Sequence, residues 1–215
     1  MQKIRTVEAL DEAIDAEISW RRQELTTTLR LVDQATGPAE RANLRAGILI
    51  LYAHWEGWVK NVAQLYVRYV HTKAYSYEQL STAFLGTALK SKINEIQQSS
   101  SALDHREFAS FIQSRLPKRA ALSLDLVKTD SNLSSTVFYE IVDRLGLPKR
   151  EEYLSRQQMI DVELVRQRNT IAHGEFINLS STDFRELRDG ILTLLSIFTD
   201  DVRNAASTDR HLLSP

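Results

Sequence analysis

The sequence contains no cysteine and few of the residues that interrupt helices. Without cysteine the chain has no disulfide framework, no thiolate zinc ligand and no thiol nucleophile, which is typical of proteins of the reducing cytosol. Seven glycines and four prolines occur among 215 residues, less than half of the roughly 12% that average usage gives. Turns are therefore few and elements long, which favours helices over sheets.

An excess of one charge and a long hydrophobic run are also missing. The 27 Lys and Arg residues nearly balance the 28 Asp and Glu residues, for a net charge of -1. This balance excludes a strongly basic nucleic-acid coat protein and a polyacidic tail, so any RNA contact must be local. The longest nearly uncharged apolar run, Ala46–Ala53, is far shorter than the about 18 residues of a membrane span. Because the first residues also lack a signal-peptide core, we expect a cytoplasmic protein with no membrane contact.

What the sequence does contain is hydrophobic residues at helical spacing through most of its length, which predicts an all-α protein. The predicted helices cover residues 4–32, 39–71, 76–96 (as one helix or two), 104–116, 131–145, 159–173 and 182–205. Ser131 or Asn132 is expected to cap the helix at 131–145, and Gly146 to end it. Gly47 and Gly57 each cost about 1 kcal/mol against alanine inside the second helix, which suggests close helix approach or a functional contact.

These elements predict one domain over residues 1–215. About 1–72 form a long helix pair, 73–130 a helical insertion, 131–205 the remaining helices and 206–215 a tail. We expect an up-and-down bundle with the insertion between the long N-terminal helices and the C-terminal helix pair.

Familiar catalytic motifs are missing: there is no glycine-rich phosphate loop, no GxSxG, no HExxH and no Cys/His cluster. Four of the five histidines are interpreted as packed or solvated residues: His54 and His71 on the second helix, His105 near the loop at 97–104, and His211 in the tail.

The fifth histidine, His173, lies in the segment ELVRQRNTIAHGE. Asn169 is four residues away and shares a helix face with it. Arg168 is five residues away, about 140° around an ideal helix, and converges on it only through its long side chain. One copy therefore makes half a site. Two antiparallel or symmetry-related copies would bring two arginines and two histidines together, enough to hold a phosphate and move protons.

The same residues have a purely structural interpretation. Arg168 could bond a carboxylate such as Asp161, Glu163 or Glu56, Asn169 could bond the backbone, and His173-Gly174 could simply be a helix end. Spacing alone leaves both interpretations open.

RNTIAHGE at 168–175, on the penultimate predicted helix, resembles the Arg-polar-x3-His signature of the HEPN superfamily (higher eukaryote and prokaryote nucleotide-binding domains). YAHWEGWVK at 52–60 and SNLSSTVFYEIVDRLGL at 131–147 further resemble a bacterial HEPN branch predicted to act as RNases, often in toxin or defence contexts. The resemblance covers about Arg41 to Ile197. It implies a HEPN-like helical bundle formed by the whole chain as a single domain.

By this resemblance the two core residues of the family correspond to Arg168 and His173, with Asn169 as the polar position after the arginine. Glu56 matches an acidic residue on the opposite long helix, where it could orient Arg168 or His173; a buried ion-pair partner that fixes helix packing is an equally open interpretation. In HEPN toxins silenced by a nucleotidyltransferase antitoxin, a target tyrosine occupies the position that is Glu175 here. We therefore do not expect control by AMP addition at that site.

Trp55 and Trp58 flank Glu56 in the sequence. Stacking on a nucleobase is conceivable for both rings, but core packing is the favoured interpretation.

The resemblance implies a metal-independent endoribonuclease that acts as a homodimer on RNA, without a cofactor, in a toxin–antitoxin or phage-defence system with a cognate antitoxin or partner protein. His173 would take the 2′-hydroxyl proton and Arg168 would stabilise the transition state. Arg166, Lys149 and Arg150 would help to grip the substrate. The alternative is a non-catalytic helical interaction module, or a nucleotide-binding module, within a defence complex.

Overall fold

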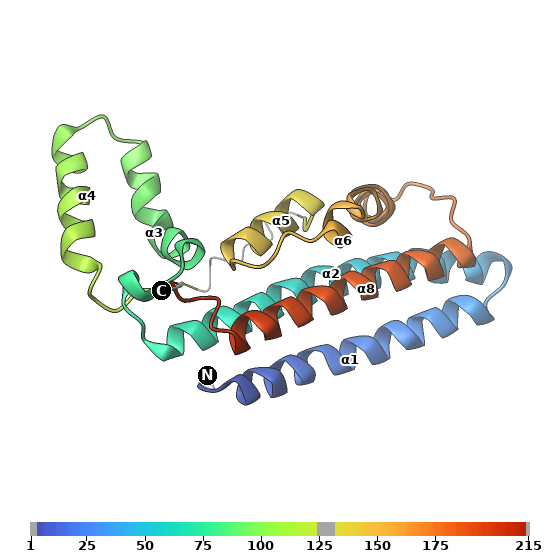
Figure 1. Cartoon of the computed structure of the whole chain (residues 1–215). Coiled ribbons are helices and arrows are strands. Elements are labelled where there is room, and N and C mark those ends of the chain that lie inside the picture. The colour runs from blue at the N-terminus through green and yellow to red at the C-terminus, as the bar shows by residue number, and fades with distance from the viewer. Residues whose placement is uncertain (1–3, 124–131, 214–215) are drawn as a thin grey trace.

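The computed structural model describes residues 4–123 and 132–213, and its elements are helices (Figure 1). Three long helices lie side by side, and α2 runs antiparallel to α1 and parallel to α8 (Figure 1). They are α1 (Val7–Gln34), α2 (Gly37–Lys73) and α8 (Ser181–Ser207). In the described part of the chain, β pairing is limited to two isolated bridges. The all-α prediction is confirmed.

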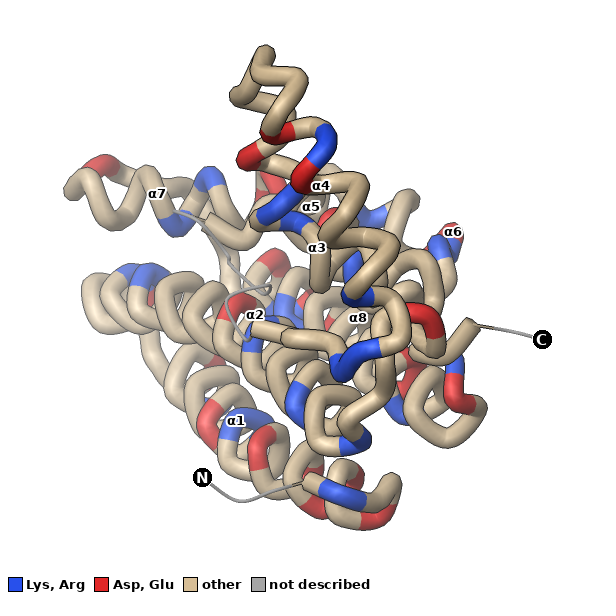
Figure 2. Tube along the Cα trace, turned by 90° about the vertical axis from the view of Figure 1, so that its left-hand side faces the viewer, with Lys and Arg blue, Asp and Glu red and all other residues tan. Residues whose placement is uncertain are grey.

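Shorter helices form a second layer and a projecting hairpin. In the second layer, η3 is a π-helix that continues directly into α7, and the helix they form crosses the three long helices (Figures 1 and 2). The second layer comprises α5 (Ser135–Arg144), α6 (Glu151–Leu154), η3 (Met159–Arg166) and α7 (Gln167–Ala172). The hairpin, at the far end of the long helices from α7, comprises α3 (Thr82–Gln97) and α4 (Ala102–Arg115) and follows the short η1 (Tyr77–Gln79).

The central helix α2 contributes 15 of its 37 residues to the buried core, all of them in the apolar segment from Leu44 to Val70. Trp55 and Trp58 are both fully buried. The indole Nε1 of Trp55 donates to the Leu133 carbonyl at 2.9 Å, and that of Trp58 donates to Thr199 Oγ1 of α8 at 2.9 Å. The two tryptophans are therefore core residues, and neither ring is available to a nucleobase.

The expected close approach at both α2 glycines is confirmed. A Cβ at Gly47 would lie 2.9 Å from the Phe184 ring of α8. A Cβ at Gly57 would lie 3.1 Å from Nη2 of Arg21 in α1. The missing side chains therefore let α8 and α1 pack closely on α2.

The start of α5 differs from the prediction. The cap is Ser134, whose hydroxyl accepts from the Val137 N–H at 3.4 Å; Asn132 precedes the helix and Ser131 lies outside the described residues. Leu133 cannot join the helix because its carbonyl and N–H are bonded to side chains of α2, those of Trp55 and Tyr52. Gly146, with φ of 65°, follows the helix as expected. The one-turn helix α6 was not predicted, since four residues carry no apolar period.

Residues 208–213 differ from the tail that we expected. The Ser81 N–H donates to the His211 carbonyl at 2.8 Å, and the Leu213 N–H donates to the Gln79 carbonyl at 2.9 Å. The His211 side chain is fully buried among aromatic rings. Those rings belong to Tyr66, Tyr69, Tyr75 and Phe84. His211 is thus part of the core, where burial lowers its pKa below the usual 6.5.

Replacing His211 should flatten the acid side of the stability profile. Below about pH 6.5 the His211 side chain binds a proton in the unfolded chain but stays neutral when it is buried in the folded one. The free energy of unfolding of the wild type therefore falls by up to about 1.4 kcal/mol per pH unit because of this residue. Above that pH the residue has no such effect. Melting temperatures of wild type and His211→Phe between pH 7.5 and 5.0 measure the difference. His105→Gln, at an exposed position, is the control. If the melting temperatures of wild type and His211→Phe changed with pH in the same way, the lowered pKa of His211 would be contradicted.

Candidate functional site

The segment with Arg168, Asn169 and His173 ends in a Schellman C-cap. The Glu175 N–H donates to the Thr170 carbonyl and the Gly174 N–H donates to the Ile171 carbonyl, both at 3.0 Å. Gly174 has φ of 78°, the left-handed conformation that glycine adopts without strain. His173 is the C-cap residue, with φ of -85° and ψ of 5°. Its side chain is therefore presented to solvent at the very end of the helix.

Arg168 points instead toward α2. Its guanidinium carbon lies 4.8 Å from the centroid of the Tyr52 ring, a cation–π geometry. Its Nη1 donates to Asn169 Oδ1 at 2.8 Å. Asn169 thereby orients the arginine, and its own amide nitrogen remains as a donor. The structure shows no hydrogen bond between the described side chains of Arg168 and His173, and His173 has already left the regular helix on which the 140° offset was calculated.

Tyr52 joins Arg168 to Glu56. Its side chain is buried, and its hydroxyl accepts from the Leu133 N–H at 3.0 Å. Burial raises the pKa of Tyr52 to about 12, the Glu56 carboxylate adds to the rise by charge and hydrogen bonding, and the Leu133 N–H and the Arg168 charge oppose it. A neutral phenol at this point donates its proton to Asn132 Oδ1 at 3.3 Å and has the Arg168 guanidinium over its ring.

Asp161 and Glu163, two of the carboxylates that could have paired with Arg168, have different surroundings. Asp161, in η3, accepts from the Ser135 N–H at 2.8 Å and from the Ser135 hydroxyl at 2.6 Å, so it binds the start of α5. Glu163 is exposed. The π-helix that contains both is a rare conformation that often occurs at functional sites.

Arg45 of α2 is a site residue that the sequence analysis did not identify. Its Nη1 donates to the Glu175 carbonyl at 2.5 Å and its Nη2 to the Ile171 carbonyl at 3.4 Å. Both carbonyls belong to the turn that presents His173, so a cation sits where the helix dipole is negative. One available signal was the spacing on α2, since Arg45, Tyr52 and Glu56 lie seven and four residues apart on one face.

The three basic residues expected to bind the substrate differ in their exposure and in their ion pairs. Arg166 is exposed at the end of η3, two positions before Arg168. Lys149 is exposed and pairs with Asp143 at 3.0 Å. Arg150 binds both carboxylate oxygens of the buried Asp201, at 2.6–2.9 Å. Arg166 thus lies on the same continuous helix as Arg168, two positions before it, whereas Arg150 is held in an ion pair with α8.

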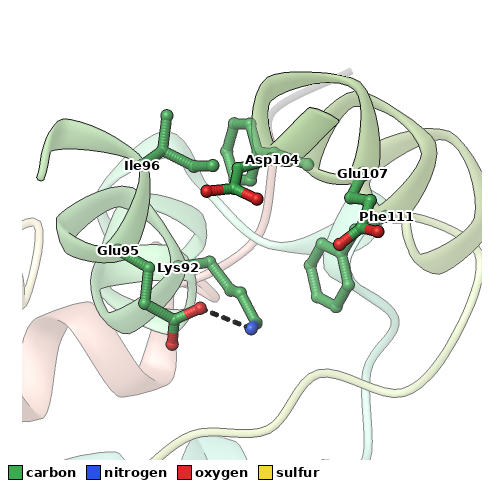
Figure 3. A pocket seen from close by; sticks show the side chains of 7 residues that line it. Lys92, Glu95, Ile96, Asp104, Glu107 and Phe111 are labelled. Carbon is green, nitrogen blue, oxygen red and sulfur yellow. Dashed lines mark hydrogen bonds and ion pairs between the residues drawn. The ribbon is translucent and has the colours of Figure 1, made fainter. Parts of the chain in front are cut away.

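Two hollows differ in charge. A groove of about 320 Å³ between α3 and α4 has three carboxylates and one lysine along its walls, and Figure 3 shows Lys92 paired with Glu95 inside it. The residues lining this groove are Lys92, Glu95, Ile96, Asp104, Glu107, Phe108 and Phe111. Excess carboxylate repels phosphate, so this groove is unsuited to RNA.

The second hollow, of about 120 Å³, lies beside the turn after His173. Its lining contains two arginines and no acidic residue: Arg41, Leu44, Arg45, Phe176, Ile177 and Leu179. We call it the motif pocket. Its charge suits a polyanion.

Within residues 4–123 and 132–213, no three His, Asp or Glu side chains are grouped so that they could hold a metal ion. No described helix is both long enough and apolar enough to cross a membrane.

Comparison with known proteins gives one match. The model of a family described as HEPN_MAE_28990-like HEPN matches residues 10–211, which include α2, the helix with Arg168 and His173, and α8. Searches of curated proteins and of solved structures find no match.

Arg45→Ala should loosen the turn that presents His173 without unfolding the bundle. The charged hydrogen bonds to two carbonyls are lost, so we expect about 1–2 kcal/mol less stability, together with faster amide exchange at 173–176. Hydrogen–deuterium exchange and thermal melting measure both effects. Lys60→Ala, at an exposed position on the same helix, is the matched control. Unchanged exchange at 173–176 would show that Arg45 does not hold the turn.

Proposed function

This chain belongs to the HEPN family whose model it matches, and from that membership we propose that it is a metal-independent endoribonuclease of a bacterial toxin–antitoxin or phage-defence system, acting in the cytoplasm. The observation that carries the proposal is the pairing of an oriented cation with an accessible imidazole. Arg168 is fixed by Tyr52 and Asn169, and His173 is exposed five residues further on.

The chemistry needs only these side chains and the ribose. Neutral His173 takes the proton of a 2′-hydroxyl, whose oxygen forms a bond to the adjacent phosphorus while the bond from phosphorus to the 5′-oxygen breaks. Arg168 stabilises the negative charge on the phosphorane-like transition state, and the Asn169 amide donates to a phosphate oxygen. An imidazolium returns a proton to the leaving 5′-oxygen. The products are a 2′,3′-cyclic phosphate and a 5′-hydroxyl, and DNA is not cut.

We further propose that two copies share the site. Within one chain, Arg168 faces α2 whereas His173 faces solvent, so one phosphate is best served by the arginine of one copy and the histidine of another. The exposed Arg166 would add charge at the same place. A cognate antitoxin or other partner protein would restrain the dimer, by a means other than AMP addition at Glu175.

Arg168→Ala and His173→Ala should each abolish RNA cleavage while leaving the fold intact. Purified wild type should cut single-stranded RNA in excess EDTA and leave cyclic phosphate ends, because no metal takes part. Gel analysis of labelled RNA, with circular dichroism of each variant, provides the measurement. Arg30→Ala, an exposed arginine of α1, is the control and should cut like wild type.

Mixing the two inactive variants tests the shared site. Dimers that contain one Arg168→Ala chain and one His173→Ala chain retain one arginine and one histidine, so part of the activity should return. A monomer with full activity in light scattering, or strict dependence on Mg²⁺, would contradict the proposal. Thermal stabilisation by mononucleotides without cut RNA would favour a nucleotide-binding module instead.

Glu56 should matter for geometry more than for the chemical step. Glu56→Gln keeps the shape and an acceptor for Tyr52, so it should lower kcat less than His173→Ala does. Glu56→Ala removes the carboxylate that acts on the Tyr52 hydroxyl, and the loss of a half-buried polar partner typically costs about 1–3 kcal/mol. Melting curves and cleavage rates of the three variants distinguish a structural role of Glu56 from a catalytic one. An Ala variant as stable as wild type but inactive would make Glu56 a catalytic acid or base.

A further inference from the structure

We propose that Phe176 and the motif pocket form a subsite that stacks one RNA base next to the cleaved nucleotide. This inference rests on the proposed function, because it names how the same site would hold its substrate. No residue of this subsite takes part in the chemical step.

The first observation is the exposure of Phe176. Its side chain is 76% exposed, more than any other large hydrophobic residue in the described chain. Leaving a phenyl ring in water forgoes burial worth about 1.5–3 kcal/mol, so a ring in this position is available to a ligand. Phe176 follows His173 by three residues, a chain length that spans at most about 11 Å. A base on this ring would therefore belong to a nucleotide near the attacked phosphate.

The second observation is the charge around the ring. Arg41 and Arg45 line the motif pocket with Phe176, and no acidic residue does. Aromatic rings accept any base by stacking, arginines add attraction to its phosphate, and a site of this kind is typical of single-strand binding. A second copy is a poorer occupant. In a two-fold contact centred on the motif pocket, the pocket of one copy would face that of the other. Arg41 and Arg45 of one copy would then lie close to the same two arginines of the second copy and repel them.

The third observation is a physical connection to His173. Arg45 lines the motif pocket and also holds the Glu175 and Ile171 carbonyls of the turn that presents His173. A base seated against Phe176 would therefore rest on the element that positions the imidazole. The subsite selects single-stranded RNA, because the faces of a base inside a duplex are covered by its stacked neighbours and are not open to the ring.

RNA binding in a cleavage-deficient background tests the subsite. Fluorescence anisotropy of a short labelled RNA is measured with His173→Ala, alone and combined with each Phe176 variant. Phe176→Ala should weaken binding about 5- to 100-fold. Phe176→Trp should restore it and Phe176→Leu should not, because leucine is apolar but has no π face. Leu103→Ala, an exposed hydrophobic residue on α4 at the other end of the molecule, is the matched control and should bind like its parent.

Abasic RNA locates the base. Single bases are removed one at a time on either side of the cut. At one position, the removal should abolish the difference in RNA affinity between Phe176→Ala and its parent, because the ring then has no base to stack on. In the cleaving protein, Phe176→Ala should raise KM with little change in kcat.

Each result separates the subsite from the proposed function. If wild type cuts RNA but Phe176→Ala and Leu103→Ala bind it equally, the subsite is wrong and the nuclease stands. If Phe176→Ala lowers the mass of the dimer in light scattering, the ring is a contact between copies and the subsite is wrong. If wild type neither binds nor cuts RNA, both proposals fall.

Discussion

The structure depends on one constraint: α2 supplies much of the buried core and must still carry polar groups to the motif. A buried polar group is costly unless it is hydrogen-bonded. Tyr52 and Trp55 meet this requirement by binding the N–H and carbonyl of Leu133, which holds the chain extended just before α5. The polar face of α2 thereby fixes the second layer, and the second layer brings the helix with Arg168 across it.

That crossing helix is attached near both ends. Toward its start, Asp161 accepts two hydrogen bonds from Ser135 and so couples η3 to α5. At its end, Arg45 binds two carbonyls of the C-cap turn. Between these attachments Arg168 lies over Tyr52. A helix of this length has little intrinsic stability in water, so tertiary contacts, rather than helix propensity, position the residues proposed to act.

Periodicity was sufficient for the long helices and insufficient for the contacts between them. The apolar pattern predicted α1, α2 and α8 closely, and the HEPN resemblance pointed to Arg168 and His173. The start of α5 was misplaced because Leu133 pairs with side chains about 80 positions earlier in the chain, a contact that no local capping rule includes. Arg45 was overlooked for the same reason, and His211 because a short aromatic pocket formed by α2 and α3 has no sequence period.

A nearly neutral chain can still present a local cationic site, because many of its arginines are neutralised elsewhere. Arg150, Arg185 and Arg203 are paired with the carboxylates of Asp201, Asp33 and Asp15. The arginines near the motif are used differently: Arg45 binds backbone carbonyls and Arg168 an aromatic ring and an amide, and neither kind of partner cancels a positive charge. Net charge therefore understates the field at this end of the molecule. An RNA strand would be attracted there over about one Debye length, roughly 8 Å at physiological salt, so its binding should weaken with added salt far more than the overall charge of the chain suggests.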